Sequence, residues 1–167
     1  MKIKNILALL GAGTLLAGCT TSEGGLVLDQ VGPEPVATGS IASTNGTLVV
    51  YSAFEASPEF NSRDVYGREY SDYQIFSPAG KLLRRVHNDS GTIALSPSPV
   101  ELPAGKYRVV ARANGFGTVT IPVLIEANRV TTMHLEGGGS WPDEAAFRKT
   151  NAVRLPDGQI VGWRMDS

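Results

Sequence analysis

Apolar and polar residues alternate along much of the chain between residues 47 and 137. A period of two is typical of a β-strand with one buried face, because successive side chains of a strand point to opposite sides. The alternation is clearest in residues 105–135, where one face would carry Tyr107, Val109, Ala111, Ala113, Val119, Ile121, Val123, Ile125, Thr131, Met133 and Leu135. Turn residues at Asn114-Gly115 and at 126–128 divide this stretch, so the pattern predicts a three-stranded antiparallel meander.

The middle strand of this predicted meander contains a proline on its polar face. Pro122 has no backbone N–H and cannot donate a hydrogen bond to a neighbouring strand. Because proline within a sheet is confined to edge strands and bulges, we expect this strand to lie at an edge or to be bulged.

Residues 48–95 predict the strands of a second layer. Residues 47–54 alternate in the same way, and residues 72–87 read as a hairpin that turns around Pro78 and Gly80. An antiparallel sheet with one solvated face needs a second layer to cover its apolar face. The predicted fold class is therefore mainly β, an antiparallel β-sandwich over residues 47–137.

Residues 138–167 predict a C-terminal extension made of a short helix and a hairpin. Pro142 suits the first turn of a helix that ends near residue 150. Residues 152–164 then predict a hairpin that turns at Pro156-Asp157-Gly158. Trp141 and Trp163 are the residues expected to anchor this extension to the sandwich.

The N-terminal segment has the layout of a secretory signal. Lys2 and Lys4 precede an uncharged apolar run over residues 6–16, which is shorter than the roughly 20 residues that a membrane-spanning helix needs. The run ends in Leu16-Ala17-Gly18-Cys19, which resembles the lipobox of bacterial lipoproteins. The resemblance implies that residues 1–18 are a signal peptide, that the Cys19 sulfur receives a diacylglycerol, and that the new amino group is acylated by a fatty acid such as palmitate.

The lipoprotein resemblance also implies a location. Two or more acyl chains give stable membrane anchoring without a transmembrane segment. Thr20 stands where aspartate commonly signals retention in the inner membrane, so we expect a lipid-anchored protein of the outer membrane or cell envelope. Residues 19–46 are rich in Ser, Thr, Gly and Pro and predict a flexible tether. Alternatively, Leu26-Val27-Leu28 is a short edge strand docked on the domain.

Part of the predicted sandwich resembles the PEGA and carboxypeptidase regulatory-like modules. The resemblance covers residues 100–137, and the residues that carry it are Leu102-Pro103-Ala104-Gly105, Tyr107, Val109 and Gly115-Phe116. Those modules share a transthyretin-like sandwich and occur as non-catalytic accessory or envelope-associated domains. The resemblance therefore implies a transthyretin-like or PEGA-like fold without an active site.

Composition narrows the range of partners. Charged residues make up 19% of the chain, the formal net charge is −1, and neither sign of charge is gathered in blocks. The basic patch that nucleic-acid binding requires is absent from the sequence, so we expect no nucleic-acid partner. Cys19 is the single cysteine, so no disulfide within the chain is expected.

Motifs for catalysis or metal binding are weak. His87 and His134, the second expected on the outward face of its strand, lack the clustered ligands of a metal site. Asp89-Ser90-Gly91-Thr92 is similar to the core motif of aspartic proteases, but a polar pair rather than an apolar strand precedes it and the chain holds no second copy. The segment is ordinary turn composition. We therefore expect no catalytic, cofactor-binding or metal-binding residue.

A tyrosine-rich loop over residues 60–73 carries three carboxylates, Asp64, Glu69 and Asp72. These groups could coordinate calcium or contact a sugar. Alternatively, Tyr70 and Tyr73 flank the start of a strand and pack into the core, with the charges solvated around them.

Taken together, these patterns predict a lipid-anchored envelope protein that is not an enzyme. Its β-sandwich would act as a binding or assembly module, with the membrane bound through Cys19 and an envelope protein or a glycan as partner. One alternative is a carbohydrate-binding accessory domain. Another is a periplasmic hydrolase that uses Asp89.

Overall fold

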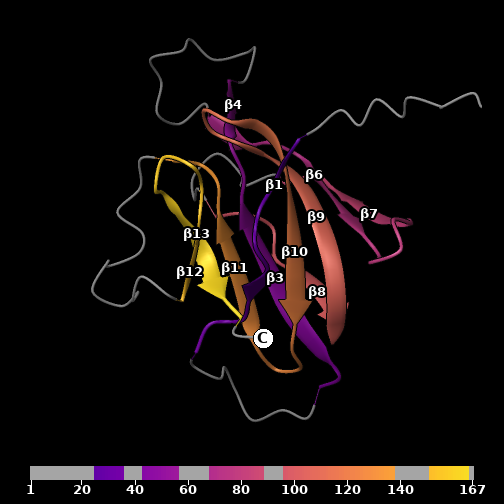
Figure 1. The fold of residues 1–167 in the computed structure, drawn as a ribbon. Coiled ribbons are helices and arrows are strands. Elements are labelled where there is room, and N and C mark those ends of the chain that lie inside the picture. Colours follow the sequence, from indigo (N-terminus) through magenta and orange to yellow (C-terminus); the bar gives the residue numbers. More distant parts are fainter. Residues whose placement is uncertain (1–24, 36–42, 57–67, 89–95, 138–150, 166–167) are drawn as a thin grey trace, which may run out of the picture.

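The computed structural model describes residues 25–35, 43–56, 68–88, 96–137 and 151–165, and the regular structure in these ranges consists of β-strands without a helix (Figure 1). In chain order the strands are β1 (Leu26–Val27), β2 (Val31–Gly32), β3 (Asn45–Tyr51), β4 (Phe54–Ala56), β5 (Arg68–Tyr70), β6 (Tyr73–Phe76), β7 (Leu82–Val86), β8 (Val100–Pro103), β9 (Gly105–Ala113), β10 (Gly117–Ile125), β11 (Val130–His134), β12 (Ala152–Arg154) and β13 (Ile160–Arg164). The protein is mainly β, as predicted. The helix predicted after Pro142 lies outside the described residues.

The large sheet is mixed, which corrects the prediction of a purely antiparallel fold. Its strands follow the order β12-β13-β2-β10-β9-β6-β7, and β1 also pairs with β10. Strands β1 and β2 run parallel to β10, whereas the pairs β9–β10, β6–β9, β6–β7, β2–β13 and β12–β13 are antiparallel.

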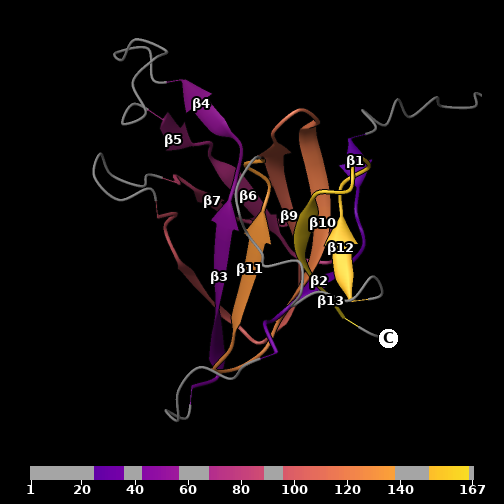
Figure 2. The ribbon, with the colours of Figure 1, turned by 90° about the vertical axis from the view of Figure 1, so that its left-hand side faces the viewer.

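A second sheet of three strands lies against one face of the large sheet (Figure 2). Its order is β11-β3-β8, with β11 parallel to β3 and β8 antiparallel to it. The expectation that residues 48–95 supply the second layer holds for β3, but β6 and β7 extend the large sheet instead. Strands β4 and β5 form a separate two-stranded sheet.

The hydrophobic core lies between the large and the three-stranded sheet. Leu48 and Val50 of β3 and Met133 of β11 face it from one side, and all three are fully buried. From the other side, the buried residues of β9 and β10 are Val109, Ala111, Ala113, Val119, Ile121, Val123 and Ile125. The alternation predicted for these strands is therefore confirmed, and burial of each large aliphatic side chain contributes about 1.5–3 kcal/mol.

Strands β9 and β10 form the predicted hairpin, but β11 does not complete a meander. The hairpin is paired without interruption from Gly105↔Ile125 to Ala113↔Gly117. After the turn that follows Ile125, the chain crosses to the other sheet, where β11 pairs with β3. The reason is that the free edge of β10, which a meander would use, is occupied by β1 and β2.

Pro122 therefore lies on a strand with neighbours along both edges, and the prediction of an edge strand is wrong. The Thr120 carbonyl accepts a hydrogen bond from the Leu28 N–H at 3.0 Å. Backbone polar groups two residues apart on a strand point to the same side, so Pro122 turns its missing N–H toward the N-terminal strands. Those strands are interrupted there, because β1 ends at Val27 and β2 begins at Val31.

Residues 25–35 belong to the folded domain rather than to the tether that was predicted over residues 19–46. Val31 is fully buried on β2, between β13 and β10. The Glu34 N–H donates to the Val130 carbonyl at 2.9 Å. Of the two expectations for the apolar stretch that begins at Leu26, the structure shows the docked strand.

The two other predicted hairpins are confirmed. The turn between β6 and β7 places Gly80 at φ 89°, and the turn between β12 and β13 places Gly158 at φ 95°. Glycine adopts such positive φ values without steric strain. Trp163 of β13 packs against Ala152 and Ile160 of the same hairpin. Trp141, the other residue expected to anchor the extension to the sandwich, lies outside the described residues.

The alternation on β9 can be tested with a pair of substitutions. Val109→Asp places a charge without a partner in the core, where Val109 is fully buried, and should cost several kcal/mol of a total stability of about 5–15 kcal/mol. Lys106→Asp, on the exposed face of the same strand, should change the free energy of unfolding by less than about 1 kcal/mol. Chemical denaturation measures both, and an equal loss in the two variants would contradict the register.

Candidate functional site

Polar and cationic side chains occupy the outer face of the large sheet, which points away from the core. On β9 the residues that alternate with the buried ones are Lys106, Arg108, Val110 and Arg112. Gln74 of β6 pairs with Val110 on one side and with Arg85 of β7 on the other. Directly paired residues of neighbouring strands project from the same face, so Arg85, Gln74 and Arg112 share the outer face.

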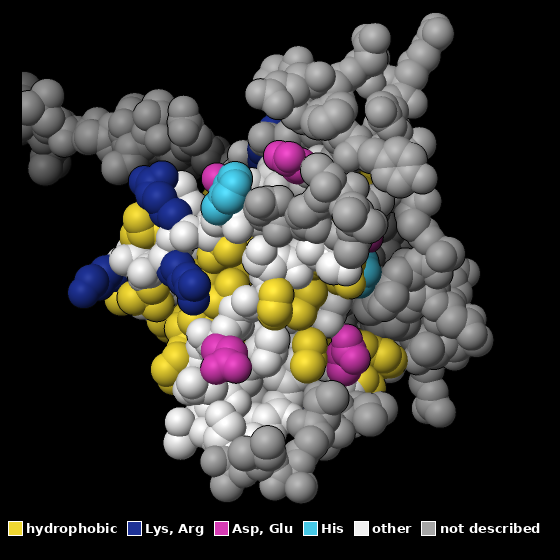
Figure 3. Space-filling view, turned by 180° about the vertical axis from the view of Figure 1, so that it is seen from behind, with side chains coloured by type: hydrophobic (Ala, Val, Ile, Leu, Met, Phe, Trp, Pro, Cys, Tyr) yellow, Lys and Arg dark blue, Asp and Glu magenta, His cyan; other side chains and the backbone are white. Residues whose placement is uncertain are grey.

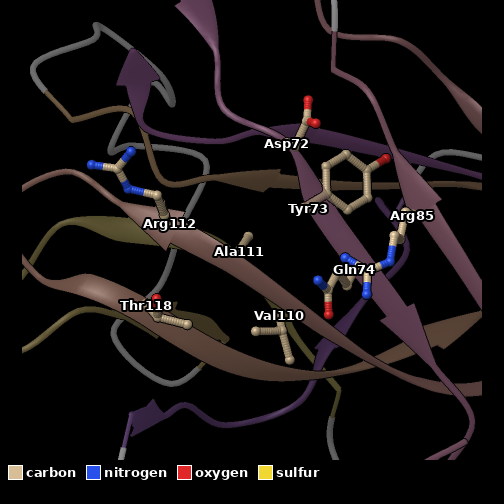
Figure 4. Close-up of a pocket in the computed structure, with 8 residues that line it drawn as sticks. All are labelled: Asp72, Tyr73, Gln74, Arg85, Val110, Ala111, Arg112 and Thr118. Atoms are coloured by element: carbon tan, nitrogen blue, oxygen red, sulfur yellow. The ribbon is translucent and has the colours of Figure 1, made fainter. Parts of the chain in front are cut away.

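These side chains surround a shallow pocket of about 260 Å³, which we call the arginine pocket. Its lining residues are Asp72, Tyr73, Gln74, Arg85, Val110, Ala111, Arg112 and Thr118 (Figure 4). Gln74 and Arg85 lie together at one side, the Arg112 side chain lies at the other, and Val110 lies between them.

Asp72 stands at one end of the arginine pocket and is held by its neighbours. Its Oδ1 lies 2.8 Å from His87 Nδ1 and accepts a hydrogen bond from the Asn88 N–H at 3.2 Å. Both partners of the Asp72–His87 contact are exposed, at 66% and 76% of their side-chain surface. The carboxylate is thereby fixed at the rim.

The chemistry of the arginine pocket suits an anionic or polar ligand. Guanidinium groups present planar forks of N–H donors that match carboxylate and phosphate oxygens, and an amide can donate and accept at the same time. Arg85, Gln74 and Arg112 rise from hydrogen-bonded strands, so the backbone that carries them is already ordered before a ligand binds.

The end of the sheet next to the arginine pocket adds further positive charge. The β7 residues Leu82, Leu83, Arg84 and Arg85 are all exposed, and Lys81 lies in the turn at the end of β7 that is farther from Asp72 and Tyr73. Seen from behind, Lys and Arg side chains gather beside hydrophobic ones on the side of the molecule where β7 lies (Figure 3). Because β7 is the last strand of the sheet order, these cations face solvent, and their field favours an anion over a cation.

Asn88 fixes the chain end of β7 to the core beside this site. Its side chain is fully buried, and its Nδ2 donates to the Val50 carbonyl at 2.8 Å and to Ser52 Oγ at 3.0 Å. Its Oδ1 accepts from the Ser98 N–H at 3.1 Å. One amide thus joins the large sheet, β3 and the segment before β8, which holds Asp72 and His87 in place.

The two histidines considered for metal binding lie in different environments. His87 is exposed beside Asp72, whereas His134 is 5% exposed. His134 lies on the outward face of its strand as expected, but it is buried because neighbouring side chains cover its ring. Among the described residues, no group of three or more His, Cys, Asp or Glu side chains is placed to hold a metal ion.

His134 belongs to an aromatic cluster on the outer side of the three-stranded sheet. Its ring stacks on Tyr51 with a centroid distance of 4.2 Å, and its Nδ1 lies 2.7 Å from Glu136 Oε1. Tyr51 meets Tyr70 edge to face, and Phe54 stacks on Tyr70. Burial, then the charge of Glu136, raises the pKa of Tyr70 to about 12.

The described part of the tyrosine-rich loop follows the structural interpretation. Tyr70 ends β5 and Tyr73 begins β6, and both are buried, while Glu69 is exposed. Burial raises the pKa of Tyr73 above its usual range. Asp64 of the same loop and the turn motif that begins at Asp89 lie outside the described residues.

Of the residues that line the arginine pocket, Asp72 was considered for ligand binding from the sequence, but Gln74, Arg85 and Arg112 were not singled out. Gln74 and Arg85 lie in the predicted hairpin over residues 72–87, Arg112 lies on a separate strand, and the three belong to no motif. The alternation did place Arg112 on the solvated face of its strand, but the pairing of β6 with β9, which brings Gln74 beside Val110, carries no local signal. The strand register was the missing information.

Comparison of the chain with models of protein families, with curated proteins and with solved structures found no match. Within the described ranges, no helix has the length and apolar character needed to cross a membrane.

The Asn88 contacts predict a large effect from one small substitution. Asn88→Ala removes the side-chain partner of the buried Val50 carbonyl and of the Ser98 N–H, at a cost of roughly 2–4 kcal/mol in the free energy of unfolding. His87→Ala, at the exposed neighbouring position, should cost less than about 1 kcal/mol. Urea denaturation compares them, and similar losses would show that Asn88 does not join the two sheets.

The raised pKa of Tyr70 predicts a loss of stability at alkaline pH. A free tyrosine ionises near pH 10, so between pH 10 and about 12 the unfolded chain releases a proton that folded Tyr70 keeps. This contribution is complete below pH 10 and is lost as the pH rises toward 12. Tyr70→Phe should remove one tyrosinate absorbance step near pH 12, and a missing step near pH 10 would contradict the burial of the hydroxyl.

Proposed function

We propose that this chain is a lipoprotein of the bacterial outer membrane or cell envelope whose β domain is a non-catalytic binding or assembly module. Support for the anchor comes from Lys2 and Lys4, the apolar run after them, and Leu16-Ala17-Gly18-Cys19. In this proposal residues 1–18 are removed, and acyl chains on Cys19 hold the mature protein on the membrane.

We propose further that the domain is a transthyretin-like or PEGA-like sandwich enlarged by strands from outside that unit. Two sheets over one core support this, as does the β9–β10 hairpin, which carries the residues shared with those modules. In this interpretation β1, β2, β12 and β13 are additions at one side of the large sheet.

The observation that carries the binding role is the arginine pocket. Its polar side chains come from four neighbouring strands and lie on an open face, where a large partner can reach them. A protein that acts by contact needs such an accessible, ordered set of donors. The partner in this proposal is an envelope component with anionic groups.

The aromatic cluster gives less support to the carbohydrate-binding alternative. Sugar recognition on a sheet face would use exposed, coplanar aromatic rings. Phe54 and Tyr70 do stack, at 4.9 Å between centroids and 24° between planes, but Tyr70 is buried and also packs against Tyr51 edge to face. The rings therefore pack on one another.

The lipid anchor can be tested at Cys19. Cys19→Ser removes the sulfur nucleophile, so the chain should remain an unacylated precursor that still begins with residue 1. Mass spectrometry of the native and variant proteins from the producing cell decides this. A native protein that starts at any residue other than an acylated Cys19 would overturn the proposal.

A further inference from the structure

The described chain begins beside the arginine pocket. Gly25 is the first described residue and lies beside Thr118, and Leu26 pairs with Val119. Thr118 lines the arginine pocket and pairs with Arg112. The N-terminal end of the domain and one side of the arginine pocket are therefore neighbours on the same sheet.

The chain between Cys19 and this point is short. Six residue steps separate Cys19 from Gly25, and even fully extended they reach no farther than about 22 Å. A tether over residues 19–46 would have let the domain stand off in any orientation. With β1 docked on β10, an anchor at Cys19 keeps the Thr118 end of the domain close to the membrane.

Among the charged residues that line the arginine pocket, Arg85 and Arg112 outnumber Asp72, which makes this end complementary to an anionic surface. Arg112 pairs with Thr118, which lies beside Gly25. The next row of paired residues across the sheet consists of Arg85, Gln74, Val110, Thr120 and Val27. Val27 is 66% exposed, which adds an apolar side chain to the same surface. Anionic lipids attract basic side chains within about one Debye length of the surface.

We infer that the Thr118 end of the outer sheet face docks on the anionic surface of the membrane that holds Cys19, with the phosphate groups of lipid headgroups at Arg85 and Arg112. This inference rests on the proposed lipid anchor. A short anchor holds the site at high effective concentration near the surface, so contacts that are weak in solution suffice to orient the domain.

Two probe positions at opposite ends of β10 test the orientation. Asn114 lies in the turn before β10 and Ala127 in the turn after it, and both are exposed. A fluorophore is attached to Asn114→Cys or to Ala127→Cys in the lipidated mature chain, whose acylated Cys19 does not react. The chains are reconstituted in phosphatidylcholine vesicles with or without phosphatidylglycerol, and a quencher is carried on the lipid headgroups.

We expect the probe at position 114 to be quenched at least about twofold more than the probe at position 127 in vesicles that contain phosphatidylglycerol. Without the anionic lipid this difference should shrink. Raising the salt concentration should shrink it as well, because screening weakens attraction between exposed charges. The salt test needs no further substitution and is valid even if the arginine variants fold poorly.

A matched pair of variants separates the arginine pocket from total charge. Arg85→Gln combined with Arg112→Gln should abolish the difference between the probes. Lys81→Gln combined with Lys106→Gln removes the same charge from the other half of the sheet and should leave the difference intact. Thermal unfolding of both variants checks that they are folded.

Each contrary outcome has a distinct meaning. Equal quenching of both probes in anionic vesicles, or equal effects of the two double variants, overturns the docking while the anchor stands. Binding of inorganic phosphate at Arg85 and Arg112, with no dependence of the quenching on phosphatidylglycerol, identifies a site for a free anion and also overturns it. A native protein without acyl chains, seen by mass spectrometry, overturns the anchor and the docking together.

Discussion

The pairing of β10 along both of its edges is the constraint on which the rest of the fold depends. β9 occupies one edge through nine paired positions, and β1 and β2 share the other. A strand with two neighbours cannot accept a third, so β11 has to leave the sheet. It pairs with β3, and the layer built on that pair closes the core above Val109 and Ile121. β11 thus follows β10 in the sequence but lies in the other sheet.

The same constraint distributes polar groups between the layers. Because the large sheet is covered on one face, its other face remains solvated, and Lys106, Arg108 and Arg112 lie there. Several polar groups that the second layer buries are hydrogen-bonded, which avoids the cost of an unmade hydrogen bond in the interior. Asn88 shows this most clearly, since its amide satisfies groups on β3 and on the segment before β8. The buried Asn88 amide therefore stabilises the fold, whereas the arginines lie on the solvated face, where a ligand can reach them.

Local patterning was sufficient to predict individual strands and tight hairpins. Alternation identified the buried faces of β9 and β10, and turn residues such as Gly80 and Gly158 located the hairpins. Long-range pairing was not predictable in the same way, because Leu26 and Val119 are equally compatible with many partners before the sheet forms. The edge strand predicted from Pro122 was wrong for a similar reason. The missing N–H of Pro122 faces the interruption between β1 and β2, which the local sequence does not predict.

For the candidate site, sequence reasoning considered histidines and carboxylates, and the structure brings Asp72 and His87 into contact but places His134 elsewhere. His87 follows β7 of the large sheet, whereas His134 lies on β11 and is enclosed by Tyr51 and Glu136. The arginine pocket is instead assembled by register, since Gln74 stands between Val110 and Arg85 only when β6 pairs with β9 and β7 at once. A site of this kind has no spacing rule in the sequence, because its members share a face and not a segment.

The central position of β2 also shapes the order in which the domain can be completed. Val31 pairs with Val123 and Arg164, so its partners lie roughly 90 to 130 residues later in the chain, and contacts of such separation form late because the intervening loop must close first. A chain that emerges N-terminus first holds β1 and β2 without partners until β10 and β13 have followed. The polar residues around these two short strands, and their interruption at Asp29 and Gln30, limit the apolar surface exposed during that interval. β1 can therefore pair once β10 has formed, whereas β2 gains its second neighbour only after β13 has followed.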